Sequence, residues 1–196
     1  MNPASHFLIS WTVANTAEIS RRDRVLVTLT GVVPDFDGVG IIVELLTENT
    51  ATPLIWYSRY HHVLGHNLLF SLFLVIGVFL LSVRRWISAI LAFLAFHLHL
   101  LGDLVGSRGP DGYQWPIPYF YPFSAKWTLA WPGQWELNAW PNILITALVL
   151  GITLYLAWKH GRSPIEMVSL KADAAFVTGL RKRFGNPLSA IARQER

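Results

Sequence analysis

Three long stretches without a charged residue constrain the fold of this chain more than any other feature. They run from Asn67 to Val83, from Trp86 to Gly102 and from Trp140 to Trp158, and each is 17 to 19 residues long. As helices they would extend about 26 to 28 Å, close to the roughly 30 Å hydrocarbon core of a bilayer. The alternative is three buried helices of a soluble bundle, but a soluble helix normally shows a polar face and these do not.

The composition agrees with a membrane protein. Only 14% of the residues are charged and the mean hydropathy is +0.39, whereas soluble domains average roughly 25% charged residues. The chain has no cysteine, which excludes disulfides and thiolate metal sites. A transition-metal site would therefore have to use histidine, aspartate, glutamate and water.

Two shorter apolar segments, Phe7 to Ala17 and Val25 to Val33, precede the long ones. Each is too short to span a bilayer alone, and Gly31 and Pro34 indicate where the second one stops. The expected fold class is all-α: an integral membrane helical bundle of about three spanning helices, a short N-terminal helical hairpin and a C-terminal amphipathic helix. Two regions are expected, a membrane-embedded helical domain (1–162) and a cytoplasmic basic tail (163–196).

The basic residues predict the orientation of this bundle. If the helices alternate in direction, 13 of the 16 lysines and arginines fall at one end, which the positive-inside rule makes cytoplasmic. In the tail, the sequence from Ser163 to Glu166 is a capping box with proline at the first helical position. The following basic amphipathic stretch is typical of a helix on anionic lipid. Membrane lipids are therefore the expected partners, and no nucleic acid is expected at residues 181–183. The 13 residues are Arg21, Arg22, Arg24, Arg84, Arg85, Lys159, Arg162, Lys171, Arg181, Lys182, Arg183, Arg193 and Arg196.

The opposite, non-cytoplasmic end of the expected helices gathers ionisable residues. His160 belongs to the basic end, but the other six histidines and three aspartates fall at this one. Such groups are costly near the apolar core and usually mark function, and neutral imidazole with carboxylate is a typical ligand set for zinc and related metals. The nine residues are His6, Asp35, Asp37, His61, His62, His66, His97, His99 and Asp103.

Their spacing strengthens the prediction. His99 and Asp103 are four residues apart and share one face of a helix, and His62 and His66 have the same spacing. Each pattern alone also has a plain explanation as a turn, a helix cap or a hydrogen-bonding residue. Convergence of four distant segments predicts a divalent-metal site of one to three ions, with zinc expected and manganese or iron as alternatives.

The motifs also resemble a known family. His6, the Pro34-Asp35-Phe36-Asp37 element, His61-x4-His66, His99-x3-Asp103 and the sequence from Tyr121 to Ser124 occur in the order seen in the YdjM-like family of membrane-bound, predicted metal-dependent hydrolases. That family is distantly similar to zinc-dependent phospholipase C and related nucleases. The resemblance covers roughly residues 5 to 124. It implies seven metal ligands and leaves His62 and His97 in second rank; the seven are His6, Asp35, Asp37, His61, His66, His99 and Asp103.

The chain departs from the family pattern in two places. His62-Val63 replaces the common Arg-Gly after the first histidine of the third motif, and Asp103 is followed by Leu-Val-Gly where a threonine three residues on is common. The N-terminal amine that the phospholipases use as a ligand is not transferred to this chain. The number of metals is therefore left open.

The expected function is a membrane-bound metal-dependent hydrolase of a phosphoester, such as a lipid headgroup. Asp35 or Asp37 is expected to act as general base, and Arg59 and Arg108 to hold a phosphate. The aromatic segment from Tyr113 to Trp140 is expected to form a belt at the membrane surface or a lid over the site. The alternative is a non-enzymatic metal-binding protein or metal transporter.

Overall fold

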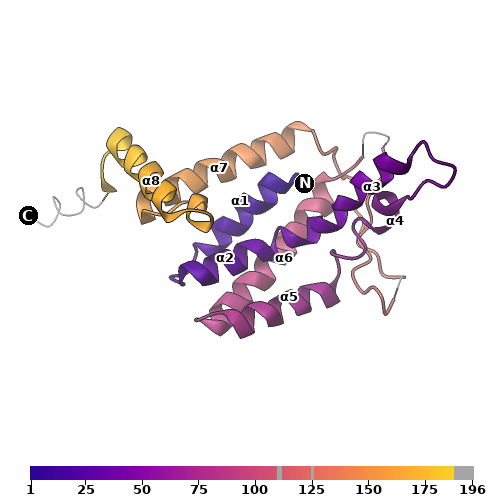
Figure 1. Ribbon diagram of the computed structural model, residues 1–196, viewed down its shortest axis with the longest axis horizontal. Helices are drawn as coiled ribbons and strands as arrows, with labels where there is room; N and C mark the ends of the chain where they lie inside the picture. Colours follow the sequence, from indigo (N-terminus) through magenta and orange to yellow (C-terminus); the bar gives the residue numbers. More distant parts are fainter. Residues whose placement is uncertain (110–111, 125, 188–196) are drawn as a thin grey trace, which may run out of the picture.

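The computed structural model describes residues 1–109, 112–124 and 126–187. All the regular elements assigned within these ranges are helices (Figure 1). Extended pairing in the same ranges is limited to two isolated bridges, Arg108 with Glu136 and Ile117 with Leu129. The all-helical prediction is thus confirmed for this part of the chain. In chain order the elements are α1 (Pro3–Ala14), α2 (Arg21–Thr30), η1 (Val33–Val39), α3 (Gly40–Thr47), α4 (Trp56–Tyr60), α5 (Leu68–Leu81), α6 (Arg85–Gly106), α7 (Trp140–His160), η2 (Pro164–Met167) and α8 (Leu170–Phe184).

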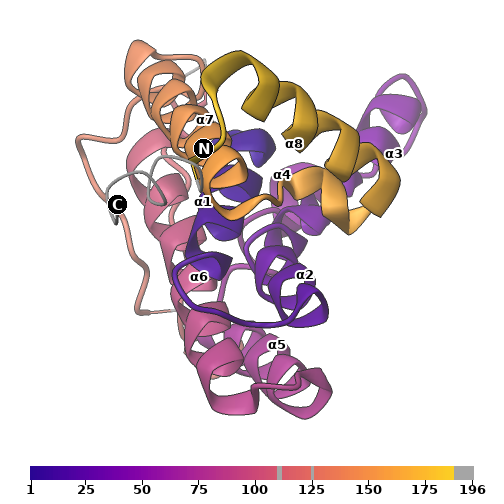
Figure 2. The same cartoon turned by 90° about the vertical axis from the view of Figure 1, so that its left-hand side faces the viewer.

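Helix α6 lies at the centre of the bundle, where α1, α2 and α5 all pack against it (Figure 2). Its buried face carries Ala89, Ala92 and Ala95, and small residues of this kind let neighbouring helix backbones approach closely. Ala14 of α1 and Val27 of α2 are fully buried in the same apolar cluster. The small-residue face of α6 therefore sets the positions of α1 and α2, both of which lead to the site.

Helices α6 and α7, with 22 and 21 residues, are long and apolar enough to cross a membrane. Helix α2 and the segment Val33–Thr47 pass the same test only as a pair, bent by 48°. Helix α5 is shorter than the uncharged run that contains it: its 14 residues extend about 21 Å. The described residues therefore contain two candidate spans, or three if the bent pair counts as one.

The bend after α2 comes from Gly31 and Pro34. Proline lacks an amide N–H and its ring collides with the carbonyl four residues before it, which here belongs to Thr30. At Gly31 an added Cβ would lie 1.8 Å from Oγ of Ser10, so only glycine fits this contact with α1. Because the helix is interrupted, the carbonyl of Gly31 is available and accepts a hydrogen bond from Nδ1 of His99 at 3.0 Å.

The connection from 107 to 139 covers the end of α6. Gln134 donates to the carbonyl of Asp103 at 2.8 Å, and Asn142 of α7 donates to the carbonyl of Gly106 at 2.8 Å. Both carbonyls are in the last turn of α6, where no intrahelical donor is available. Ile117 is fully buried against Phe96 in a second apolar cluster. The last turn of α6, which carries Asp103, is therefore held from both sides.

The opposite end of the bundle is fastened by a buried ion pair. Arg24 binds both carboxylate oxygens of Glu166 at 2.8 and 3.0 Å and also donates to the carbonyl of Ile19 at 2.6 Å. This corrects the predicted capping box: Glu166 pairs with Arg24, and the amide of Ser163 donates to Asp173 at 2.7 Å instead. The element at this point is the short 3-10 helix η2, and the long helix begins only after Ser169.

Helix α8 carries the basic tail and lies at the end of the molecule remote from α3 and α4 (Figure 1). Arg181 folds back to donate to the carbonyl of Trp158 at 3.0 Å, at the carboxyl end of α7. A cation is favoured there because the last carbonyls of a helix carry partial negative charge. Arg193 and Arg196 lie outside the described residues.

Candidate metal centre

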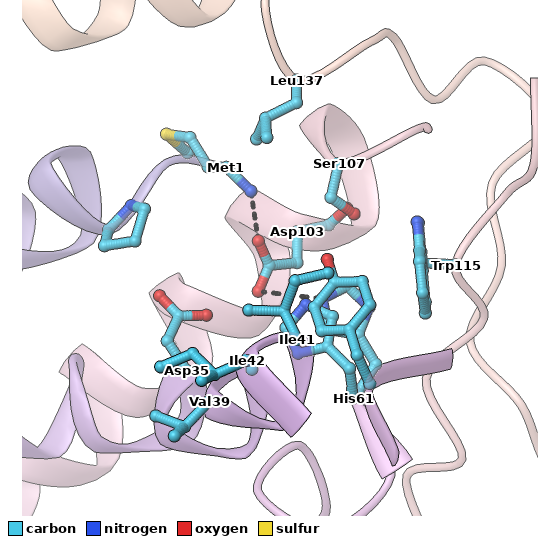
Figure 3. A pocket seen from close by; sticks show the side chains of 14 residues that line it. Met1, Asp35, Val39, Ile41, Ile42, His61, Asp103, Ser107, Trp115 and Leu137 are labelled. Atoms are coloured by element: carbon cyan, nitrogen blue, oxygen red, sulfur yellow. Dashed lines mark hydrogen bonds and ion pairs between the residues drawn. The ribbon is translucent and has the colours of Figure 1, made fainter. Parts of the chain in front are cut away.

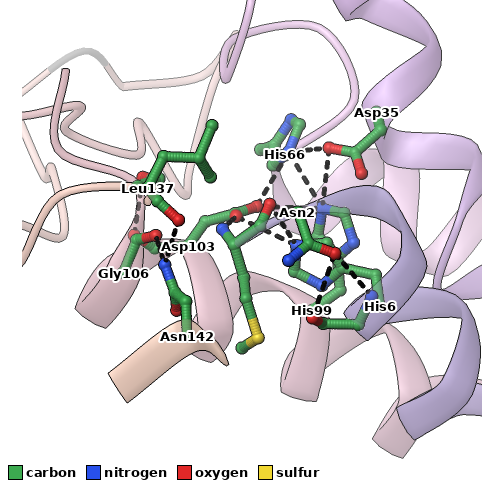
Figure 4. A network of polar contacts seen from close by, with 12 residues as sticks. Asn2, His6, Asp35, His66, His99, Asp103, Gly106, Leu137 and Asn142 are labelled. Atoms are coloured by element: carbon green, nitrogen blue, oxygen red, sulfur yellow. Dashed lines mark hydrogen bonds and ion pairs between the residues drawn. The ribbon is translucent and has the colours of Figure 1, made fainter. Parts of the chain in front are cut away.

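Four segments bring histidine and aspartate side chains together at the end of the bundle near α3 and α4 (Figure 4). They are the start of α1, the helix η1 after the bend, the turn between α4 and α5, and two successive turns on one face of α6. Six residues from these segments form two groups with metal-ligand geometry, and one residue belongs to both. The six are His6, Asp35, His62, His66, His99 and Asp103.

The first group contains His6, Asp35, His99 and Asp103, each offering one ligand atom within 4.8 Å of the others. Nε2 of His6 lies 3.1 Å from Oδ1 of Asp103, and Nε2 of His99 lies 3.0 Å from Oδ2 of the same carboxylate. Nε2 of His99 is also 3.6 Å from Oδ1 of Asp35. Two imidazoles and two carboxylates match the ligands that zinc and related metals take when cysteine is absent.

The second group contains His62, His66 and again Asp103. Nε2 of His66 and Nε2 of His62 lie 3.4 and 3.9 Å from Oδ2 of Asp103. His62 has a backbone φ of 64°, a left-handed conformation that costs a non-glycine residue of the order of 1 kcal/mol or more. This conformation accompanies the full burial of the His62 ring against the group. Asp103 belongs to both groups, so its carboxylate would contribute to whichever group held a cation.

Several buried polar atoms of these groups have no hydrogen-bond partner among the described residues. They include Oδ2 of Asp35 and Oδ2 of Asp103, both of which are acceptors. In addition, Nε2 of His66 lies only 3.0 Å from Nε2 of His99, and two imidazole nitrogens at this distance need a proton or a cation between them or beside them. Leaving buried polar groups unpaired is costly, so the donor set fits bound divalent cations.

Asp37 belongs to neither group and instead fixes two of the histidines. It accepts hydrogen bonds from Nδ1 of His61 at 2.7 Å and Nδ1 of His66 at 3.2 Å, and from the amide of Gly65 at 3.1 Å. A carboxylate on the far nitrogen of a ligating histidine sets its tautomer and orientation. Asp37, which the sequence suggested as a ligand, therefore lies behind His66. It contacts Nδ1 of that ring, while Nε2 of His66 faces Asp103.

The remaining sequence candidates lie at different distances from the groups. His61 lines the cavity beside them without joining either group. His97 points elsewhere, donating through Nδ1 to the carbonyl of Phe93 and accepting from the hydroxyl of Tyr119 through Nε2, both at 2.8 Å. Arg59 is exposed beside the ring of Tyr60 and lines neither neighbouring cavity.

A cavity of about 390 Å³ opens beside the two groups. Asp35, His61, His62 and Asp103 line it together with Ile41, Ile42 and other apolar side chains, and Figure 3 shows Asp35 beside Ile42. The amino group of Met1 also reaches this wall, where it contacts Oδ1 of Asp103. A small molecule in this cavity can therefore contact the candidate metal ligands directly.

Two histidines of the second group differ in their protonation. Burial opposes the charged form of His66, but the carboxylates of Asp103 and Asp37 outweigh burial and raise its pKa to about 9. The pKa of His62 lies well below its usual range because burial penalises its charged form and Asp103 compensates less. Without a cation, a proton on His66 thus balances part of the negative charge.

This difference predicts a pH dependence of stability. A raised pKa means that protonated His66 stabilises the metal-free fold below pH 6.5, its ordinary pKa, and that the stabilisation disappears as the pH rises towards 9. A cation takes the place of that proton, so metal should bind more tightly across the same window. We expect the melting temperature of the protein in detergent, after its metal has been removed with a chelator, to fall from pH 6.5 to 9. The increase in melting temperature on adding zinc should become larger over the same range. His66→Gln should weaken both trends; a chelated protein that becomes more stable over this window would contradict the assignment.

Comparison with known proteins agrees with the membrane character of the chain. No curated protein and no solved structure matches it. A family model described as YdjM inner membrane protein matches residues 1–180. The match covers every candidate ligand and most of α8, which is far more than half of the chain. The chain therefore belongs to the YdjM inner membrane protein family.

Proposed function

We propose that this protein is a membrane-embedded, metal-dependent hydrolase of phosphoesters, with a lipid as the preferred substrate. The observation that carries the proposal is the pair of ligand groups sharing Asp103 at the wall of an open cavity. Zinc is the expected metal, with manganese or iron as alternatives, because the ligands are imidazoles and carboxylates. When bound at such a site, divalent cations activate water and neutralise the charge of a phosphoester.

His61 and Asp37 are suited to proton transfer in this reaction. Asp37 holds Nδ1 of His61 at 2.7 Å, which leaves the other ring nitrogen of a cavity-lining histidine to exchange a proton with a bound molecule. A carboxylate that accepts from a histidine in this way holds its tautomer and orientation. Asp35, whose Oδ2 has no hydrogen-bond partner among the described residues, is the second candidate for accepting a proton from water.

The site belongs near one surface of the membrane in this proposal. His99 is 14 residues and Asp103 is 18 residues beyond the start of α6 at Arg85, or about 21 and 27 Å along a helix. The hydrocarbon core is roughly 30 Å thick, so both side chains fall close to the headgroups. With the basic residues at the other end taken as cytoplasmic, the site faces the non-cytoplasmic side, and the basic tail lies on anionic lipid inside the cell.

A resident metal site accounts for the ligand arrangement better than a transport route. All groups of metal-ligand geometry found in residues 1–109, 112–124 and 126–187 include Asp103. A transporter needs ligands that lead towards both sides of the membrane, and the described residues near Arg24 and Glu166 form no such group. The transporter remains the competing function that the experiment must separate.

The test combines metal analysis with turnover. We expect the protein purified in detergent to contain stoichiometric zinc, manganese or iron and to hydrolyse at least one substrate in a panel of phosphodiesters and phospholipids. His61→Ala should retain the metal and lose about 100-fold or more in kcat, since general acid–base catalysis contributes at least that much. His97→Gln, which changes a histidine outside the site, should retain both. Bound metal without turnover, together with metal flux in proteoliposomes, would establish the transporter instead.

A further inference from the structure

A second cavity adjoins the one beside the metal groups. Its volume is about 560 Å³, and the two cavities share part of their lining. The shared residues are Tyr57, Ser107, Trp115 and Leu137. Ser107 follows α6 directly, four residues after Asp103, and its hydroxyl donates to the Asp103 carbonyl at 2.7 Å. A molecule bound at the metal groups can therefore extend past Ser107 into the second cavity.

Arg108 lines this second cavity. Its backbone is fixed, because its amide donates to Trp135 at 3.0 Å and its carbonyl accepts from Leu137 at 3.2 Å. Its Nε, in contrast, is buried and has no hydrogen-bond partner within the described ranges. Other buried or half-buried arginines of the same ranges, such as Arg24 and Arg162, are bound to carboxylates.

An anion in the second cavity would satisfy this guanidinium. An unpaired buried N–H costs free energy, and arginine binds phosphate or carboxylate through two parallel hydrogen bonds. Burial, followed by the charges of Asp35, Asp37 and Asp103, raises the pKa of Tyr57, which lines both cavities, so its phenol adds no charge there. Arg108 is the cationic side chain among the described residues that line the second cavity.

The other end of the first cavity is apolar. Val39, Ile41 and Ile42 line it, and they belong to η1 and α3 within the bent candidate span. The apolar surface continues along α3, where Leu45 and Leu46 are 59% and 78% exposed. This exposed apolar surface can pack against the chain of a lipid whose headgroup lies in the cavity.

We propose that the joined cavities bind an amphiphile with two anionic groups, the first at the metal groups and the second at Arg108, and with its apolar chain along α3. The proposal rests on the proposed function, which it makes more specific. The substrate class is a lipid whose headgroup carries a second phosphate or a carboxylate beyond the phosphoester to be hydrolysed. A lipid diphosphate is the simplest member of this class.

Binding of matched probes tests the proposal without relying on turnover. The zinc-loaded protein in detergent is titrated calorimetrically with farnesyl monophosphate, farnesyl diphosphate and inorganic pyrophosphate. We expect the diphosphate to bind about 10- to 100-fold more tightly than the monophosphate, the range expected for hydrogen bonds to a charged group. Arg108→Gln should abolish this preference and Arg108→Lys should restore part of it. Arg59→Gln, an exposed arginine outside both cavities, should leave it unchanged.

Each result separates one part of the proposal. An unchanged preference in Arg108→Gln with intact metal content, or an equal loss in Arg59→Gln, would overturn the role of Arg108. Pyrophosphate that binds as tightly as farnesyl diphosphate would overturn the amphiphile. Phosphate release is measured separately: if no substrate is hydrolysed but the preference depends on Arg108, the hydrolase fails while the anion site stands. If a substrate is hydrolysed but the diphosphate is not preferred over the monophosphate, the hydrolase stands and the anion site at Arg108 fails.

Discussion

Asp103→Asn is expected to remove metal from both ligand groups at once. Asp103 is the one residue common to the two groups, and asparagine keeps its size while removing the negative charge. Changes behind a ligand already cost about 10- to 100-fold in affinity, so loss of a shared ligand should leave less than about one-tenth of the wild-type metal. Elemental analysis of protein purified in detergent measures this directly.

Single-group variants provide the comparison. His6→Gln and His62→Gln each affect a different group, so each should reduce the metal content by about one ion per chain rather than remove all of it. His97→Gln should retain the full content because both ring nitrogens of His97 are engaged elsewhere. Wild-type metal content in Asp103→Asn would refute the shared site, and a complete loss in His62→Gln would mean that the groups are not independent.

Arg24→Gln is expected to destabilise the opposite end of the bundle strongly. Arg24 and Glu166 are both buried and hydrogen-bonded to each other. Removing one member of a buried ion pair costs about 3–5 kcal/mol, because the other charge is left uncompensated. The melting temperature in detergent should therefore drop by many degrees, and protease sites in the 163–187 region should become accessible.

A charge-matched control and a double variant isolate the pair. Arg22→Gln removes an exposed arginine of the same helix and should change the melting temperature little, since exposed charges contribute about 0–1 kcal/mol. Arg24→Gln combined with Glu166→Gln should recover part of the lost stability because no buried charge is left alone. An Arg24→Gln protein as stable as Arg22→Gln would contradict the importance of the pair.

The sequence predicted the long helices well, but not the length of α5 or the presence of α3. The uncharged runs that begin at Trp86 and Trp140 correspond to α6 and α7. An uncharged apolar run of bilayer length is by itself a strong indication of a helix. Helix α5 is shorter than its run, and α3 has no counterpart among the expected segments. A segment of eight mostly apolar residues without a side-chain N-cap does not distinguish a helix from a turn or a strand. The break at Gly31 and Pro34 was predicted, although its role in orienting His99 depends on packing against α6.

The candidate site was likewise predicted only in part from the sequence. His99 and Asp103 were predicted to share a helix face, and the structure places both in the first ligand group. His62, placed in second rank from the sequence, lies in the second group in the structure. Its place there depends on a left-handed backbone conformation at a non-glycine residue, which no local pattern indicates. Asp37 stood beside Asp35 in the sequence as an equivalent candidate. Only the fold separates a carboxylate that faces the centre from one that orients the histidines.

The spread of the ligands along the chain has a consequence for the physical character of the protein. A cation bound to the first group would join His6 to Asp103 and so close a loop of 97 residues in a chain that has no cysteine. Cross-links over long loops lower the entropy of the unfolded chain. A ligand that binds only the native state, at a free concentration 1,000 times its Kd, raises the free energy of unfolding by about 4 kcal/mol. The metal would then act as a reversible cross-link, and the cellular metal supply would set how long each molecule resists unfolding and proteolysis.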